Sequence, residues 1–149
     1  SIRPHREWPR IYWKELAKKL RKDEFDVLIL CVHGLYFKDD IGLVNNISLG
    51  KIFALFEKAK MVVGCDSAPI HIAGITETPA LAILGPTTEH VFKHLPLVKT
   101  LSMSKDEIEC TGCWFHGEYT HNPCDFGCLS LCCITPDVVY KNIIEEVKI

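Results

Sequence analysis

The chain has 149 residues, a net charge of −2 and 48% hydrophobic residues. A chain of this length buries roughly two-thirds of its unfolded surface, so we expect one globular domain with a real core. The near-neutral charge and the lack of a long basic run argue against nucleic-acid recognition, which needs a clustered cationic face. No apolar stretch reaches about twenty residues, so the sequence predicts no membrane-spanning segment.

In the first half of the chain, helical and strand patterns alternate. Residues 10–22 predict an amphipathic helix. Its apolar face is expected to hold Ile11, Leu16, Ala17 and Leu20. Residues 25–32 are a near-continuous apolar run of strand length. Residues 33–46 have no clear pattern, and they are followed by a short strand near 46–47 and a helix at about 49–59.

In the second half, strands are predicted at 61–64, 80–84 and 97–102, and helices at 69–75 and 136–147. Residues 104–133, which are rich in cysteine, are predicted to be irregular. Strands that alternate with helices form a parallel sheet that is covered on both faces. We therefore predict one Rossmann-like α/β domain over residues 1–149, with a parallel sheet and helices on both faces.

Residues 61–88 carry the most informative pattern of the chain. The strand at 61–64 leads to Asp66 and Ser67, and Pro69 suits the first turn of a helix. A helix N-terminus carries about half a positive charge and several unpaired N–H donors, so an anionic group is stabilised there. His71 lies on the first turn, within reach of such a group. The pattern predicts a phosphate site.

The next strand adds polar groups to the same edge of the sheet. It ends in Gly85-Pro86-Thr87-Thr88, and ligands of open parallel sheets bind along the carboxyl edge. A simpler interpretation is that Asp66 or Ser67 only caps the helix and that His71 is a half-buried structural histidine. The chain has neither G-x-G-x-x-G nor G-x-x-x-x-G-K-[ST], which argues against dinucleotide dehydrogenases and P-loop kinases.

The central block D-S-x-x-x-H, then an alanine-rich helix, then T-P-x-x-A-I-L-G-P-T, resemble glycosyltransferase family nine, the ADP-heptose:lipopolysaccharide heptosyltransferases. Three further segments are similar to motifs of the C-terminal half of these enzymes. They are Arg6-Glu7-Trp8-Pro9, Ile47-Ser48-Leu49 and the cysteine-rich stretch that ends in Ile134-Thr135-Pro136-Asp137-Val138-Val139. The resemblance covers nearly the whole chain.

The resemblance implies the C-terminal, donor-binding half of a glycosyltransferase B fold, in an inverting, metal-independent enzyme without a cofactor. Such an enzyme moves heptose from ADP-heptose to the lipopolysaccharide inner core, in the cytoplasm and at the inner face of the inner membrane. The acceptor site and the general base would lie in an N-terminal half outside this chain, with Ser1 as an internal cut. Residues 1–149 would then bind the nucleotide sugar and contain no catalytic residue.

The candidate donor-binding residues are Arg6, Ile47, Asp66, Ser67, Ala68, His71 and Thr87. By resemblance, Arg6 would neutralise the phosphates and Ile47 would lie against the nucleotide base, although an ordinary core role for Ile47 is an equal alternative. The family usually has glycine where Ala68 stands, and a helical backbone would tolerate the extra methyl group. The family's acidic ribose contact would be Asp39 or Asp40, without a clear register.

The cysteines form two groups. Cys31 and Cys65 lie in strand-like surroundings and are predicted to be buried thiols. The second group comprises Cys110, Cys113, Cys124, Cys128, Cys132 and Cys133, with His116 and His121 between them. These residues are sufficient for a tetrahedral zinc site, but the alternative is a reduced loop that merely packs, and we predict no metal. The sequence leaves two other functions open, a non-catalytic nucleotide- or sugar-binding module and a zinc-stabilised interaction domain.

Overall fold

The sheet that carries the candidate site has three parallel strands. The computed structural model describes residues 6–31, 42–45, 47–116 and 127–147. Strands β3 (Val62–Cys65), β4 (Ala80–Leu84) and β5 (Val98–Ser102) lie in the order β3-β4-β5, and β1 (Leu28–Cys31) pairs in parallel with β2 (Gly42–Asn45). The parallel pairing confirms the predicted fold class, although the described strands form two sheets rather than one.

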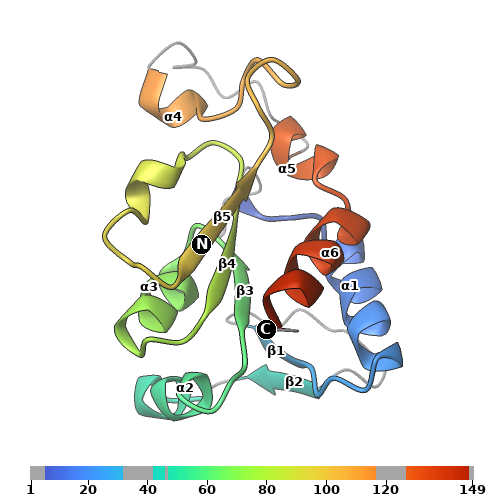
Figure 1. Ribbon diagram of the computed structural model, residues 1–149, viewed down its shortest axis with the longest axis vertical. Helices are drawn as coiled ribbons and strands as arrows, with labels where there is room; N and C mark the ends of the chain where they lie inside the picture. Colours follow the sequence, from blue (N-terminus) through green and yellow to red (C-terminus); the bar gives the residue numbers. More distant parts are fainter. Residues whose placement is uncertain (1–5, 32–41, 46, 117–126, 148–149) are drawn as a thin grey trace.

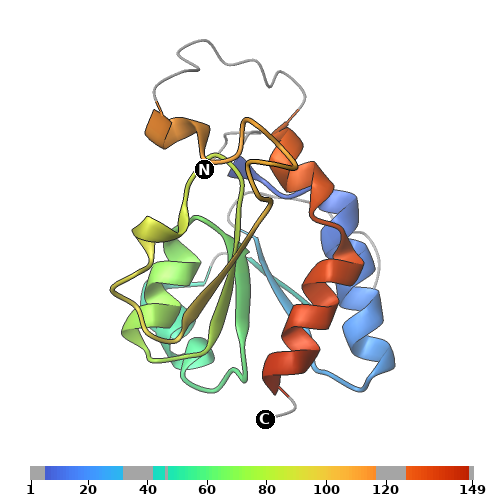
Figure 2. The ribbon, with the colours of Figure 1, turned by 45° about the horizontal axis from the view of Figure 1, so that its top comes forward.

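Helices cover both faces of the three-stranded sheet (Figure 1). On one face lie α2 (Leu49–Phe56) and α3 (Ala68–Ile75), and on the other lie α1 (Arg10–Lys22) and α6 (Pro136–Val147). Figure 2 shows the same layers from another angle, with α1 and α6 side by side. None of the described helices combines the length and the apolar character that crossing a membrane requires.

Strand β4 runs through the core and separates two hydrophobic clusters. All five of its residues are buried, and successive side chains of a strand point to opposite faces. Leu81 and Ile83 pack with residues of α1 and α6, whereas Ala80, Ala82 and Leu84 pack with residues of α2 and α3. Burial on both sides explains why residues 80–84 form an uninterrupted apolar run.

Helix α1 has the predicted bounds, but one residue of its predicted apolar face is misplaced. Leu16 and Leu20 are buried, whereas Ile11 is 57% exposed. Five residues are about 1.4 helical turns, so Ile11 lies on a different side of the helix from Leu16. An aromatic residue ahead of the helix fills the core instead. Trp8 is buried, and its indole N–H donates to the carbonyl of Ile134 at 2.7 Å.

Three other predicted boundaries are wrong by a few residues. The strand predicted at 25–32 begins at Leu28, because the N–H of Phe25 is used to close the end of α1. The helix predicted to reach about residue 59 ends at Phe56, because the N–H groups of Lys58 and Ala59 bond to carbonyls three residues back, as in a turn. The strand predicted near 46–47 lies instead at residues 42–45, in β2.

The sequence predicted that the cysteine-rich segment, residues 104–133, is irregular. This prediction is wrong in part. The segment contains two short helices, α4 (Cys113–His116) and α5 (Leu129–Cys133). Helices this short show no periodic pattern, so only tertiary contacts reveal them. In α5, Leu131 is buried and the hydroxyl of Ser130 lies 3.1 Å from that of Thr111. Residues 117–126 lie outside the described part of the chain.

Two glycines provide a matched test of this packing. A Cβ atom at Gly85 would come within 2.6 Å of Leu131 Cγ and 2.7 Å of Cys128 Sγ, whereas a Cβ atom at Gly50 in α2 meets no described heavy atom within 4 Å. We expect Gly85→Ala to lower the free energy of unfolding by about 1–3 kcal/mol through overpacking. Gly50→Ala should raise it by roughly 0.5–1 kcal/mol. Urea denaturation measures both, and equal effects would show that α5 does not pack against the end of β4.

Candidate functional site

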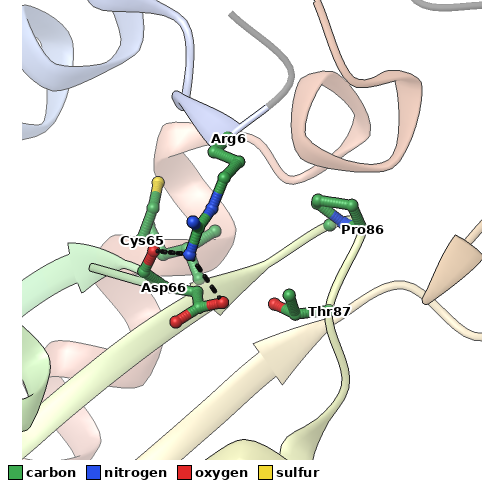
Figure 3. Close-up of a pocket in the computed structure, with 7 residues that line it drawn as sticks. Arg6, Cys65, Asp66, Pro86 and Thr87 are labelled. Carbon is green, nitrogen blue, oxygen red and sulfur yellow. Dashed lines mark hydrogen bonds and ion pairs between the residues drawn. The ribbon is translucent and has the colours of Figure 1, made fainter. Parts of the chain in front are cut away.

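The candidate site lies where β3 and β4 end side by side. Cys65 of β3 is paired in register with Ile83 of β4, so the residues that follow the two strands meet at the carboxyl edge of the sheet. Seven residues line a small, shallow hollow there (Figure 3). They are Arg6, Cys65, Asp66, Ile83, Gly85, Pro86 and Thr87. The hollow is far smaller than the about 300–1,000 Å³ of ordinary ligand pockets, so it does not enclose a whole nucleotide sugar.

An ion pair between Arg6 and Asp66 forms one wall of this pocket. Arg6 Nη2 lies 2.9 Å from Asp66 Oδ2 and also donates to the backbone carbonyl of Asp66 at 2.6 Å. The two side chains are only 22% and 12% exposed. Two contacts from one nitrogen fix the guanidinium above the end of β3, so residues that are sixty positions apart lie in direct contact.

The turn after Asp66 leaves the start of α3 without a side-chain cap. Ser67 occupies the N-cap position, but its hydroxyl donates to the carbonyl of Cys65 at 3.1 Å and makes no capping bond. The simple capping interpretation of Ser67 is therefore wrong. Ala68 is the first residue of α3, so its backbone is helical. A helical backbone is the condition under which we expected the methyl group of Ala68 to be tolerated. N–H donors at an uncapped helix start suit an anionic group, but here Pro69 has no N–H and the N–H of Ile70 donates to the Ser67 carbonyl at 3.1 Å, so the turn offers few donors.

His71 lies on the first turn of α3 and faces the same carboxylate. Its Nε2 is 3.9 Å from Asp66 Oδ1, and its side chain is 42% exposed. The other neighbour of the imidazole is Phe92, whose ring centroid lies 5.0 Å away at an interplanar angle of 38°. Phe92 is buried and follows the short 3-10 helix η2 (Glu89–Val91). His71 is therefore held between a buried aromatic ring and a carboxylate, with one side open to solvent.

Buried polar atoms without partners surround the pocket. Within the described part of the chain, no hydrogen-bond partner lies near Thr87 Oγ1, Thr88 Oγ1 or Arg6 Nε. Thr87 is 3% exposed, and Figure 3 shows its hydroxyl turned toward the Asp66 carboxylate. A buried hydroxyl or N–H group without a partner costs about 1–3 kcal/mol. Two of these atoms, Thr87 Oγ1 and Arg6 Nε, belong to residues that line the pocket, which favours a site that is completed by a polar ligand.

Two residues of this site were missed by the sequence prediction. The ring of Phe92 contacts His71 at a tilted angle, and the indole of Trp114 in α4 lies over Arg6, with Arg6 Cζ 4.9 Å from the ring centroid. Both lie in segments without a periodic pattern, so no signal in a single sequence distinguishes them from ordinary packing.

Some predicted residues lie elsewhere or beyond the described chain. Ile47 is half-buried just before α2 and is not among the residues that line the pocket. Asp39 and Asp40 lie outside the described residues. The other predicted positions, Arg6, Asp66, Ser67, Ala68, His71 and Thr87, lie at the ends of β3 and β4 or in the contacts described above.

The cysteines are distributed over several parts of the chain. Cys128 is buried in the cluster that α1 and α6 share, which agrees with the packing interpretation for that residue. Among the described residues, no group of three or more histidine, cysteine, aspartate or glutamate side chains is placed to hold a metal ion. Cys124 and His121 fall outside the described part, so the zinc alternative stays untested.

Cys65 is predicted to be a buried thiol, and the residue is half-buried. Burial among protein groups raises the pKa of its thiol to about 12, and the negative charges of Glu7 and Asp66 act in the same direction. A hydrogen bond from the backbone of Trp8 opposes this shift but does not cancel it. The side chain of Cys31 lies outside what the structure describes.

Comparison with known proteins gives a consistent result. The family model described as glycosyltransferase family 9 (heptosyltransferase) matches residues 1–119. Lipopolysaccharide heptosyltransferase 3 of Escherichia coli is 34% identical over a region that covers 37% of this chain and 21% of that protein. The structure of E. coli ADP-heptose lps heptosyltransferase II has a TM-score of 0.72 and 19% identity, over 97% of this chain and 43% of that chain. E. coli heptosyltransferase WaaC with ADP-2-deoxy-2-fluoro heptose has a TM-score of 0.66 and 17% identity, over 97% and 40%.

The fold likeness to these solved enzymes defines the class, an α/β domain that matches part of a heptosyltransferase fold. Because the family model covers well over half of the residues, the chain belongs to glycosyltransferase family 9. It spans less than half the length of the solved enzymes and about a fifth of the length of the curated relative.

The thiol of Cys65 gives a direct test of the site's packing. With a pKa of about 12, on the order of one thiol in ten thousand is ionised at pH 8, so iodoacetamide should leave Cys65 unmodified in the folded chain. Labelling should increase only as the pH approaches 12, and Cys65 should react readily at pH 8 in urea. Mass spectrometry of the peptide that contains Cys65 measures both. Rapid labelling of the folded chain at pH 8 would contradict the described environment.

Proposed function

We propose that this chain is the donor-nucleotide-binding domain of a heptosyltransferase that moves heptose from ADP-heptose to the lipopolysaccharide inner core. The observation that supports it best is the Arg6–Asp66 pair at the carboxyl edge of the sheet, beside the unpartnered buried hydroxyl of Thr87. Membership of glycosyltransferase family 9 supports the reaction class. The ADP-heptose analogue named for one structural relative supports the donor, and the name of a curated relative supports the acceptor.

In this proposal, the diphosphate of the donor binds at the ends of β3 and β4. Arg6 supplies a positive charge, and the start of α3 supplies the positive end of the helix dipole and the backbone N–H of Ala68. The Thr87 hydroxyl can donate to a phosphate oxygen and gain the partner that it lacks. His71 is exposed on the side away from Phe92 and can contact the same group. The nucleotide base would extend toward Ile47.

The proposed chemistry is displacement at the anomeric carbon by an acceptor hydroxyl, with inversion and without a metal. The bond to the diphosphate breaks, so negative charge develops on the leaving group. Arg6, His71 and the start of α3 lie where they can stabilise that charge in a preorganised site. This role requires no proton transfer by the donor domain. We propose that the general base and the acceptor pocket belong to another part of the full-length enzyme.

The proposal includes a cytoplasmic site of action, with the enzyme in peripheral contact with the inner face of the inner membrane. The acceptor named for the relatives is a lipopolysaccharide, whose lipid part is held in a membrane. A sugar donor in solution and a lipid-anchored acceptor meet at the membrane surface.

Replacement of His71 tests the donor site. We expect His71→Ala to weaken ADP binding by about 1–3 kcal/mol, the scale of a hydrogen bond to a charged group, with an unchanged melting temperature because the side chain is partly exposed. His94→Ala is the matched control, because His94 is an exposed histidine two residues after Phe92 and does not line the pocket. Isothermal titration of ADP measures both variants. An unchanged dissociation constant for a folded His71→Ala variant would contradict the assignment.

A second prediction concerns activity. Asp66 is the one carboxylate among the described residues that line the pocket, and Arg6 holds it. Deprotonation and positioning of the acceptor hydroxyl contribute several kcal/mol, which this site cannot supply. We expect residues 1–149 to bind ADP but to release no ADP from ADP-heptose in the presence of a lipid A-core acceptor.

We expect heptosyl transfer to the acceptor when an acceptor-binding half is joined to the chain. Release of ADP is followed by a coupled assay, with the acceptor omitted as the control. Acceptor-dependent turnover by residues 1–149 alone would show that catalytic residues lie within this chain.

A further inference from the structure

Helix α1 carries a large share of the positive charge of the chain. The chain has 17 lysine and arginine residues. Those in α1 are Arg10, Lys14, Lys18, Lys19, Arg21 and Lys22. The helix has a single acidic residue, Glu15. Because the whole chain has a net charge of −2, its near-neutral total hides a local cationic surface.

Four of these basic residues form a row along the helix. They follow one another at intervals of four residues, and residues at this spacing are neighbours on a helix surface. They are Arg10, Lys14, Lys18 and Lys22. At 1.5 Å per residue, the row extends over about 18 Å. Leu16 and Leu20 are buried on the opposite side of the helix. Figures 1 and 2 both show α1 at the edge of the molecule, beside α6.

Three members of this basic row are available to a partner. Arg10, Lys18 and Lys22 are exposed, and none of them forms an ion pair with another residue in the described part of the chain. By contrast, Lys19 is used within the fold, where its Nζ lies 2.7 Å from Asp137 Oδ1. Like charges four residues apart on a helix repel each other. An anionic partner would remove that repulsion.

An exposed apolar residue lies on the same face as the basic row. Ile11 is 57% exposed, and it precedes Lys14 by three residues and Lys18 by seven. A bilayer surface accommodates both kinds of side chain, since cations meet the anionic headgroups and an apolar side chain enters the layer below them. A nucleic-acid backbone would attract the cations but would offer no apolar surface to the isoleucine. Ile11 therefore favours a lipid surface.

The basic row begins close to the pocket. Arg10 follows Arg6, which lines the pocket, by four residues, so their Cα atoms are at most about 14 Å apart. At the other end of α1, three exposed acidic residues follow Lys22. They are Asp23, Glu24 and Asp26. The positive surface is therefore concentrated over the first turns of α1, on the side of the helix from which Arg6 enters the pocket.

We propose that the exposed face of α1, with Arg10, Lys18 and Ile11, binds the surface of a bilayer that contains anionic phospholipid. Each lysine or arginine near such a surface is attracted to it, and attraction of this kind falls off within a Debye length. The contact would hold the donor pocket near a lipid-anchored acceptor. The inference thus rests on the proposed function for its purpose, whereas the lipid contact itself rests on the charge and the exposure of α1.

Binding to vesicles tests the charge of this face. Residues 1–149 should sediment with vesicles of phosphatidylcholine and phosphatidylglycerol in about equal parts, and should stay in solution with phosphatidylcholine alone. The double variant Arg10→Gln/Lys18→Gln should bind about 10–25-fold more weakly. Lys58→Gln/Lys60→Gln removes the same charge from exposed residues that follow α2, on the other face of the sheet, and should bind as wild type does. Arg10→Lys/Lys18→Arg keeps the charge and should also bind normally.

Two further measurements separate the electrostatic contact from the apolar one. Raising the salt concentration from about 0.05 M to about 0.5 M should release wild-type protein from the vesicles. Ile11→Ser should weaken binding about 3–10-fold at low salt, because the apolar side chain no longer enters the layer. Ile75→Ser is the matched control, since Ile75 is 67% exposed at the end of α3, and it should leave binding unchanged. The salt titration uses wild-type protein and so applies even if a variant fails to fold.

Titration of ADP into the same proteins separates this inference from the proposed function. Wild-type protein that binds ADP but no anionic vesicles would overturn the inference and leave the proposed function standing. Wild-type protein that binds vesicles but not ADP would overturn the proposed function and leave the lipid contact of α1 supported. Equal losses in the two glutamine variants would show that only the total charge matters, which would overturn the inference. Binding to a DNA duplex as tightly as to the vesicles would also overturn it.

Discussion

The ion pair between Arg6 and Asp66 is the contact on which the candidate site depends. Asp66 is 12% exposed, and a carboxylate so little hydrated requires a cation and hydrogen bonds. Arg6 meets this requirement only because Trp8, two residues later, is anchored in the core by its bond to the Ile134 carbonyl. The N-terminal segment is thereby fixed between the end of β3 and the segment that joins α5 to α6. Removal of that anchor would displace Arg6, uncover Asp66 and open one wall of the pocket.

Much of the fold could be predicted from the sequence because its signals are local. The run at 80–84 is apolar at every position, since β4 is buried on both sides, and Pro136 begins a helix with the predicted bounds. The polar residues after β3 and β4 were expected to meet, because parallel neighbours bring their carboxyl ends to one edge. The proximity of Asp66 and Thr87 could therefore be predicted from the parallel order of the strands. The boundaries that failed, at Phe25 and Phe56, are set by single turn hydrogen bonds that leave no pattern in the sequence.

The contacts that complete the site could not be predicted in the same way. Arg6 reaches Asp66 across sixty residues, and Trp114 reaches Arg6 across an even longer separation. Such pairs depend on how α4 and α5 dock, and those helices are too short to be recognised by periodicity. The resemblance to a family located Arg6, Asp66 and His71 but gave no partner for any of them. The resemblance also assigned Ile47 to the donor site, but Ile47 is not among the residues that line the pocket at Asp66.

Asp66 both positions and neutralises Arg6, and this limits the role that it can have in the proposed donor site. A diphosphate brings further negative charge, which the carboxylate of Asp66 would repel if the two groups were in direct contact. Net attraction must then come from groups that Asp66 does not neutralise, namely the dipole at the start of α3, with the N–H of Ala68, and the hydroxyl of Thr87. In the proposed function, Asp66 is therefore a positioning residue for Arg6 and His71. The phosphate contacts fall to Arg6, the α3 turn and Thr87.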